Sequence, residues 1–427
     1  MLRKLLKAIG WTAAGLVGLV VLLYLAALAI NWRDREPSAA AKHLAQVSRD
    51  RPAVAEANNA FAYLQQWEQN PDRHGRRPAP VEEFLETCRQ GKPECAAAFD
   101  RADGLFAQWS AAEGELLEAY MALSTRSGWH EGNVFTEESI PRYSGPMDGQ
   151  KMLLLRAREL AKQGDADQVR KLLERDLRFW RMVLESSDIL VSKMMATVAL
   201  TRHFEWGTLV LRSLPAARQA TAIPAGWRNE ILDTERSMER CMAGEWLFSS
   251  SILRRAASDY FGVTSEHAIA RGVTWLAVPL YQQQDTINRY AEHNLSVARA
   301  FEVPLTAYPR VVAEVREREQ RTANDLFPYG AVYNLPGAWF FSFMLVSSDS
   351  TTYYVRVSDV EGVRRAALTA AILRSSGVEA QGVSAALSNA DQRDPYTDLP
   401  FAWDDKLGAI VFRGLQTGER GEHRIYY

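Results

Sequence analysis

Hydrophobic residues follow three different patterns along this chain, and each pattern predicts a different kind of structure. The first is an apolar run from Ala8 to Ile30, which only Thr12 interrupts with a polar side chain. About 20 helical residues span a hydrocarbon layer of ~30 Å, and a helix satisfies its own backbone groups there. Residues 8–30 are therefore predicted to form an N-terminal transmembrane helix.

The second pattern is helical periodicity, which dominates residues 56–326. Segments such as "CAAAFDRADGLFAQWSAAEGELLEAYMALSTR" carry apolar residues at steps of three and four. Two such segments meet at Gly164-Asp165 and resemble a single tetratricopeptide hairpin. No second copy follows 34 residues later, so a repeat array is not predicted. The positions that carry the resemblance are Leu153, Ala157, Leu160, Gly164 and Leu173.

The third pattern begins at residue 327 and mixes strand and helix signals. Ser358 and Glu361 have the spacing of a capping box, which predicts a helix start there. The segments "LPFAW" and "AIVFRGL" flank "DDKLG", a typical β-hairpin arrangement, and "EHRIYY" can add a strand. Residues 327–427 are therefore predicted to form a small α+β domain.

Together these patterns predict a mainly α fold: a transmembrane helix, an irregular α-helical domain with one tetratricopeptide-like hairpin, and a small C-terminal α+β domain. The expected divisions are a basic cytoplasmic segment, the transmembrane helix, a polar tether, the α-helical domain and the α+β domain with its C-terminal β-hairpin. Their bounds are 1–7, 8–30, 31–55, 56–326 and 327–427.

Positive charge at the N-terminus predicts the orientation of the membrane helix. Arg3, Lys4 and Lys7 precede the apolar run, and basic flanks stay on the cytoplasmic side. The chain is thus expected in a bacterial inner membrane as a single-pass protein, with its bulk in the periplasm. A cleaved signal peptide is the alternative, because Ala27 and Ala29 fit a small-x-small cleavage site.

Small residues at four-residue spacing mark one face of the membrane helix. Gly10, Ala14 and Gly18 would let a second helix approach closely, which makes a homodimer one interpretation. The other interpretation is that these are ordinary small residues facing lipid.

Two of the three cysteines surround a Gly-Lys-Pro turn in "CRQGKPEC". Export places Cys88 and Cys95 in an oxidising compartment, which favours a disulfide across a helix–helix turn. Free thiols, or a metal or redox role, are the alternatives. Cys241 has no evident partner and is expected to be a buried apolar side chain.

Composition narrows the classes of partner and reaction. The formal net charge of the 427-residue chain is −2, which gives no electrostatic case for nucleic-acid binding. No nucleotide, hydrolase or metalloprotease motif is present, and no cofactor or metal is predicted. The one cluster with catalytic potential lies in a long loop at residues 127–149. Its side chains can be interpreted as an acid–base site or as the polar surface of a solvated loop. Its residues are His130, Glu131, Glu137 and Glu138.

The segment "DPYTDLPFAW" near the C-terminus is similar to the turn that precedes a β-hairpin in type II secretion pseudopilins. In this chain Asp394 is expected to accept backbone N–H bonds. The prepilin peptidase site and the calcium loop of that family are missing, so a shared local turn is the interpretation. The residues that carry the resemblance are Asp394, Pro395, Tyr396, Pro400, Phe401 and Trp403.

The whole chain resembles uncharacterised membrane-anchored bacterial envelope proteins, a resemblance that implies no activity. The sequence therefore predicts a membrane-anchored envelope protein whose exported helical part is an interaction or scaffold domain for an envelope protein partner. The alternative is a periplasmic hydrolase that uses the carboxylates of the 127–149 loop.

Overall fold

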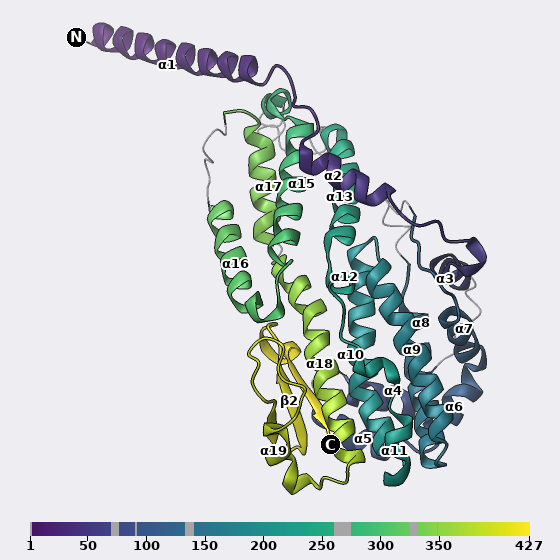
Figure 1. The fold of residues 1–427 in the computed structure, drawn as a ribbon. Helices are drawn as coiled ribbons and strands as arrows, with labels where there is room; N and C mark the ends of the chain where they lie inside the picture. The colour runs from purple at the N-terminus through teal and green to yellow at the C-terminus, as the bar shows by residue number, and fades with distance from the viewer. Residues whose placement is uncertain are drawn as a thin grey trace. The chain divides into compact units, whose positions relative to one another are not determined.

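The computed structural model is mainly helical and ends in one small antiparallel sheet (Figure 1). It describes residues 2–69, 77–89, 92–132, 141–259, 275–324, 332–347 and 349–427. These residues form two compact units. Unit 1 comprises residues 1–49, 246–297 and 314–349, and unit 2 comprises residues 50–245, 298–313 and 350–427. This grouping differs from the expected division at residue 327, because each unit collects segments that are distant in sequence.

Unit 1 contains the N-terminal apolar helix α1 (Leu2–Ile30). Within it, residues 6–30 are long and apolar enough to cross a membrane, as the hydrophobic run predicts. The other elements of the unit are α2 (Ala39–Arg49), the short helix η5 (Val278–Leu280) and α17 (Leu335–Ser347), with parts of α13 (Glu239–Asp259), α15 (Gln283–Ala300) and α16 (Tyr308–Asn324).

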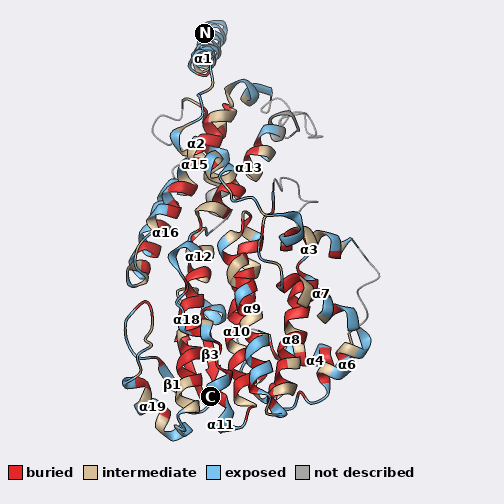
Figure 2. Ribbon diagram, turned by 45° about the vertical axis from the view of Figure 1, so that its right-hand side comes forward, coloured by how far each residue is buried: buried red, intermediate tan, exposed pale blue. Residues whose placement is uncertain are grey.

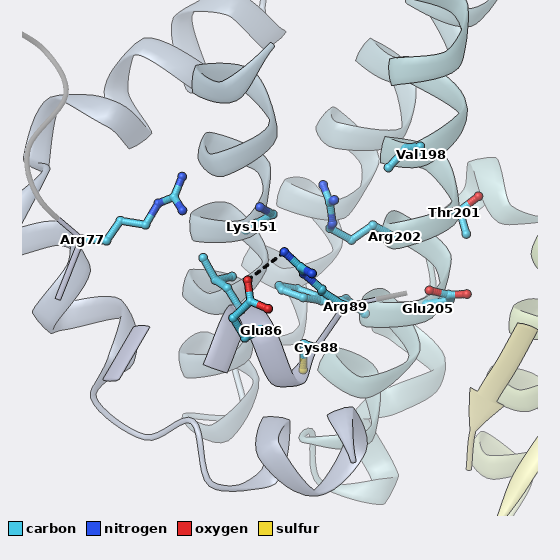
Figure 3. Close-up of a pocket in the computed structure, with 11 residues that line it drawn as sticks. Arg77, Glu86, Cys88, Arg89, Lys151, Val198, Thr201, Arg202 and Glu205 are labelled. Carbon is cyan, nitrogen blue, oxygen red and sulfur yellow. Dashed lines mark ion pairs between the residues drawn. The ribbon is translucent and has the colours of Figure 1, made fainter. Parts of the chain in front are cut away.

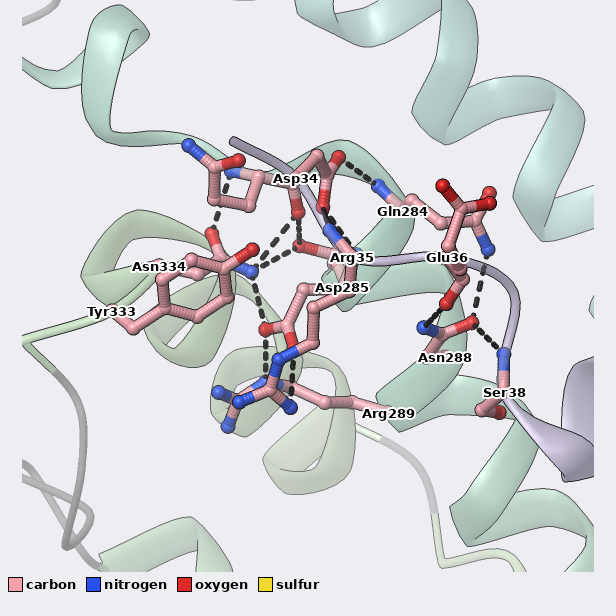
Figure 4. Close-up of polar contacts among 12 residues, drawn as sticks. Asp34, Arg35, Glu36, Ser38, Gln284, Asp285, Asn288, Arg289, Tyr333 and Asn334 are labelled. Carbon is pink, nitrogen blue, oxygen red and sulfur yellow. Dashed lines mark hydrogen bonds and ion pairs between the residues drawn. The ribbon is translucent and has the colours of Figure 1, made fainter. Parts of the chain in front are cut away.

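The segment that follows α1 is held by side-chain hydrogen bonds within unit 1, although the sequence suggests a polar tether there (Figure 4). The Asp34 carboxylate accepts from the backbone N–H groups of Gln284 and Asp285 at 2.6 and 3.0 Å, and so caps the first turn of α15. Asn288 accepts from the Ser38 N–H at 2.9 Å and donates to the Glu36 carbonyl at 2.9 Å. These bonds hold residues 34–38 along α15.

Unit 2 begins with short helices that enclose the aromatic side chains of its core. They are α3 (Ala60–Glu68), α4 (Ala79–Thr87), α5 (Cys95–Asp100), α6 (Leu105–Ala112) and α7 (Gly114–Ser124). Phe84, Phe99 and Trp206 pack as a cluster with ring centroids 5.5–5.9 Å apart. Such packing gives these short helices a stability that their length alone does not supply.

Three long helices form the centre of unit 2: α8 (Ser144–Lys162), α9 (Ala166–Ser186) and α10 (Leu190–Arg212). Gly164 has φ 79°, a left-handed conformation that glycine adopts without strain, and it ends α8. Asp165 then caps α9 by accepting from the Gln168 N–H at 3.1 Å. The predicted helical hairpin therefore exists, while its likeness to tetratricopeptide hairpins stays a prediction.

A fully buried polar network joins these helices. His203 Nδ1 lies 2.7 Å from the Asp176 carboxylate, and the Trp227 indole N–H donates to His203 Nε2 at 2.8 Å. Tyr120 also donates to Asp176, and Gln150 does so at 3.1 Å. Because both ring nitrogens of His203 are engaged, this His–Asp pair stabilises the core and offers no free atom for catalysis.

The C-terminal part of unit 2 packs α18 (Thr351–Ser375) against α10, and both helices also contact strand β3. Strands β1 (Ala402–Asp404), β2 (Ala409–Arg413) and β3 (Glu422–Tyr426) pair antiparallel in that order, with Trp403 opposite Ile410 and Ile410 opposite Ile425. The predicted hairpin and the third strand are confirmed. The remaining elements are η1 (Glu56–Asn58), α11 (Ala216–Ala222), η4 (Ala225–Arg228), α12 (Asp233–Arg236), η6 (Leu305–Ala307), α19 (Ala380–Ser388) and η7 (Gly418–Gly421).

The predicted capping box at Ser358 and Glu361 is wrong. Helix α18 begins at Thr351, so both residues lie inside it and are buried. Glu361 instead accepts from Arg364 and Arg365, at 2.7–2.8 Å. Buried residues make up much of the central helices of unit 2 (Figure 2). The tertiary packing of α18 therefore extends the helix past Ser358, although the local sequence there has the spacing of a capping box.

A candidate anion-binding groove

Only part of the predicted loop site can be placed. Glu137 and Glu138 lie outside the described residues. His130 is half-buried, and its backbone exchanges hydrogen bonds with the Asn59 side chain at 2.9 and 3.0 Å. That exchange attaches the start of the loop to the N-terminus of α3.

Glu131 is buried against the N-terminus of α10, where its carboxylate acts as a cap. It accepts from the backbone N–H groups of Asp188 and Ile189 at 2.6 and 2.8 Å, and from the Trp129 indole at 2.8 Å. Glu245 accepts from the next N–H, that of Leu190, at 3.0 Å. Carboxylates are favourable at the positive end of a helix dipole, so this cluster is well suited to a structural role.

Burial raises the pKa of Glu131 to about 7, with the nearby Asp188 carboxylate adding to the shift and hydrogen bonds opposing it. A carboxyl group that titrates near neutrality is typical of an acid–base catalyst. However, donors occupy both oxygens of Glu131, and its side chain does not line any of the cavities described below. This geometry favours the capping role.

The residues of the predicted disulfide and of the predicted C-terminal turn also lie in unit 2. The sulfur atoms of Cys88 and Cys95 are at disulfide distance, 2.16 Å, and join the end of α4 to the start of α5. Asp394 accepts from the N–H groups of Tyr396 and Thr397 at 2.8 and 3.1 Å. Tyr396 then donates to the buried Asp359 at 2.7 Å.

The rest of that turn packs against the sheet. Phe401 is buried and packs edge-on against Phe412, with the ring centroids 6.2 Å apart. Trp403, in β1, donates its indole N–H to Asp405 at 2.6 Å. Asp394, Tyr396 and Phe401 therefore fasten the end of the chain to α18 and β2.

A different part of unit 2 presents a site that sequence reasoning did not find. Two adjoining cavities of about 270 and 350 Å³ lie along one face of α10. They share Arg89, Val198 and Thr201, so together they form an elongated groove. We call it the arginine groove, since its lining has six cationic side chains against three carboxylates: Arg77, Arg89, Lys151, Arg202, Arg356 and Arg420 against Glu86, Glu205 and Asp359.

Five different parts of unit 2 supply these cations. Arg77 and Arg89 flank α4, Lys151 is on α8, and Arg202 is on α10 (Figure 3). In the adjoining cavity, Arg356 is on α18 and Arg420 is in η7. The groove therefore exists only in the folded unit.

Several of these cations already have partners. Arg89 pairs with Glu86 at 3.0 Å, Lys151 with Asp148 at 2.9 Å, and Arg77 also with Asp148. Within the described part of the chain, Arg202 makes no ion pair; its guanidinium donates to the Gln150 amide oxygen at 3.0 Å. Neither Arg356 nor Arg420 has a carboxylate partner among the described residues.

The electrostatics of the groove reflect this excess of positive charge. Burial lowers the pKa of Lys151, and the neighbouring Arg202 lowers it further. Burial and then the charge of Arg420 lower the pKa of Arg356. Burial raises the pKa of Asp359, whereas His423 and hydrogen bonds from Tyr396 and from backbone N–H groups oppose the shift. A bound anion would relieve the mutual repulsion of these cations.

Comparisons with known proteins add no information about this groove. Neither a family model, nor a curated protein, nor a solved structure matches the chain. Inferences about function therefore depend on the residues themselves.

Two further features of the described residues bear on which ligands the protein can bind. No group of three or more His, Cys, Asp and Glu side chains is placed to hold a metal ion in the described ranges. A third cavity of about 450 Å³ has an aromatic wall formed by Phe301, Tyr308 and Tyr354 and an acidic rim. Arg236 on that rim pairs with Asp233, so the rim carries less net charge than the arginine groove.

Proposed function

We propose that the protein is a single-pass envelope protein of the bacterial inner membrane whose exported part binds an acidic segment of a partner protein in the arginine groove. The binding is non-catalytic in this proposal. The observation that carries it is the convergence of six cationic side chains on one continuous groove beside α10. Arginine pairs with carboxylates through two parallel hydrogen bonds, which gives orientation as well as attraction.

The shape and lining of the groove favour a peptide segment over a small anion. Two cavities in a row offer more length than a single phosphate needs. Apolar side chains line the same cavities as the cations: Leu85 and Trp206 in one cavity and Val198 in both. A segment that carries carboxylates beside apolar residues matches this mixed surface, as interfaces often combine a charged rim with apolar contacts.

A contact near the end of α1 supports a retained membrane anchor. The Tyr24 hydroxyl donates to the Leu276 carbonyl at 3.1 Å. Cleavage after Ala29 would remove Tyr24 and its contact. With Arg3, Lys4 and Lys7 kept in the cytoplasm, the remainder of the chain lies in the periplasm in this proposal.

The hydrolase alternative has weaker support. Of its four residues, Glu131 has both oxygens occupied and His130 contributes backbone contacts. Since Glu137 and Glu138 lie outside the described residues, the alternative stays a prediction.

The proposal predicts salt-sensitive binding that depends on the groove arginines. A fluorescent peptide that alternates Glu and Leu should bind the full chain in detergent, and added salt should weaken it because exposed charges are screened. Arg356→Gln should weaken binding roughly fivefold, which corresponds to about 1 kcal/mol for a partly buried charged pair. The double change Arg89→Gln with Arg420→Gln should weaken it more.

Arg413→Gln is the matched control, because Arg413 also lies in unit 2, is exposed, and does not line the groove. Equal affinity of all these variants would contradict the proposal. Competition by inorganic phosphate at the same concentration as the peptide would indicate a small-anion site instead. A photo-crosslinking residue in place of Val198, compared with one in place of Leu399, would then identify the partner.

A further inference from the structure

Exposed apolar side chains gather around the C-terminal end of α1 in unit 1. Trp32 is 89% exposed, Trp275 is 75% exposed and Val332 is 60% exposed. Leu276 and Val278 are also exposed. We call these five residues the collar. Large aromatic and aliphatic side chains at this exposure are unusual when clustered on a protein surface that faces only water.

Hydrogen bonds place the collar beside the membrane helix itself. Leu276 accepts from the Tyr24 hydroxyl at 3.1 Å through its backbone carbonyl. Val332 likewise accepts from the Asn31 side chain at 2.9 Å. Asn31 is buried, and it also accepts from the Asn334 N–H at 2.7 Å. The collar segments are therefore attached to α1 at two levels, one at Tyr24 and one just beyond Ile30.

The position of Tyr24 indicates the depth of the collar. The apolar part of α1 has 25 residues, from Leu6 to Ile30. At about 1.5 Å per residue it is roughly 37 Å long, which exceeds a hydrocarbon thickness of ~30 Å. Its last turns therefore reach the boundary between acyl chains and headgroups, the layer in which Tyr and Trp are enriched. Leu276, bonded to Tyr24, belongs to the same layer.

We propose that the collar is a membrane-interface surface, which rests on the outer leaflet of the same bilayer that α1 spans. This proposal depends on the membrane anchorage proposed above and adds a second contact with lipid. Trp32, Trp275 and Val332 enter the headgroup layer, as the apolar faces of interfacial segments do. The collar thereby limits the tilt of unit 1 on the membrane.

The polar cluster behind the collar gives it the rigidity that such a surface needs (Figure 4). Asn334 is fully buried, with φ 58°, and its side chain bonds to the Gln282 backbone at 2.9 and 3.0 Å and to Asp285 at 2.8 Å. Arg35 bonds to the same Asp285 carboxylate at 3.1 Å and lies over the Tyr333 ring. These contacts fix the two collar segments relative to the end of α1.

Site-specific labelling of the full chain in phosphatidylglycerol-containing vesicles tests the proposal. Val332→Cys and, separately, Trp275→Cys are labelled with a polarity-sensitive dye. Each label should emit at a shorter wavelength than the same dye does in aqueous buffer. Lipids that carry a nitroxide group should quench its fluorescence. The matched control is Leu399→Cys, since Leu399 is 62% exposed and lies in unit 2. Its label should stay aqueous and unquenched.

A label at Val20→Cys, within α1, separates the two proposals. If Val20 is quenched by lipid while Val332 and Trp275 behave like Leu399, α1 inserts and the collar proposal is overturned. If the Val20 label is also aqueous, the anchorage itself fails. Collar labels that are shielded from water but not quenched by nitroxide lipids would show a protein partner in place of the membrane and would also overturn the proposal.

Discussion

Glu131 shows how a single buried carboxyl group can combine a structural role with a perturbed pKa. Its oxygens accept from two backbone N–H groups at the N-terminus of α10 and from the Trp129 indole. Burial raises its pKa from the ordinary 4.5 to about 7, because the charged form loses its hydration. The same burial that makes the group resemble a catalyst also closes it to substrate.

The raised pKa of Glu131 predicts a pH-dependent stability. Between pH 4.5 and 7 the folded protein keeps a proton that the unfolded chain has released, so the free energy of unfolding falls as pH rises through this window. The loss should total roughly 3 kcal/mol, at about 1.4 kcal/mol per pKa unit. Below pH 4.5 and above pH 7, Glu131 does not make the free energy of unfolding depend on pH.

Glu131→Gln should remove this pH dependence of the free energy of unfolding. Denaturant unfolding in detergent at several pH values would measure it. The variant should be less stable than the parent at pH 4.5 by about 1–3 kcal/mol, because an amide cannot accept from all the donors. The difference should then vanish or reverse by pH 7, because the parent alone loses roughly 3 kcal/mol across this window. Exposed Glu82, changed to Gln, is the control and should leave this pH dependence unaltered. A parent–variant difference that stays constant across the window would contradict the assignment.

Among the elements, the link between α4 and α5 carries one covalent constraint. Cys88 and Cys95 are at disulfide distance, and Arg89 of the groove follows Cys88 directly. A ring this short should stabilise the fold by about 2.5 kcal/mol, through its effect on the unfolded chain. Cys88→Ser and the double change with Cys95→Ser should therefore destabilise equally, since both remove the same bond.

Unfolding of the full chain in detergent, with and without reductant, would check this prediction. Cys241 should not react with alkylating agents in the folded state, because it is buried and burial raises the pKa of its thiol to about 12. Unreduced protein with three alkylatable thiols after unfolding would show that no bond had formed. A Cys88→Ser variant as stable as the parent would show that the bond contributes nothing.

Elements were predictable where their signals are local. The apolar run of α1, the Gly164-Asp165 turn between α8 and α9, and the β1–β2 hairpin each depend on neighbouring residues. The sequence from Pro224 to Phe261 predicts one long helix, or one that breaks near Gly244, but the structure has η4, α12 and then α13, which continues through Gly244. Glu361 accepts from the Ile231 N–H at 2.9 Å, a contact between distant residues that holds this segment in its broken form.

The arginine groove could not be predicted for a related reason. Its cations are separated by up to hundreds of residues, and no two of them form a recognisable motif. They converge because α10 packs against α8 and α18, and because the Cys88–Cys95 turn and η7 border the same face. The collar is similar: Trp32, Trp275 and Val332 become one surface only through the contacts of Asn31 and Tyr24.

At the scale of the whole molecule, the two units have different chemistry. Unit 1 carries α1 and the exposed apolar collar, whereas the arginine groove lies entirely in unit 2. This separation fits a protein that is anchored by one unit and binds its partner with the other. It also means that peptide binding in the groove and membrane contact by the collar can fail independently, since no residue of the collar lines the groove, whereas the collar proposal still requires the membrane anchorage of α1.

Topology is the prediction that belongs to this scale. Alkaline phosphatase fused after residue 60 should be active, and a fluorescent protein that matures only in the cytosol should be dark at the same position, because basic residues hold the N-terminus inside. As a control, both reporters fused before residue 8 should show the opposite pattern. Intact mass of the purified protein should include α1, since Tyr24, which cleavage would remove, bonds to Leu276. Reversed reporter activities would overturn the orientation, and a mass that begins near Ile30 would show a cleaved signal peptide.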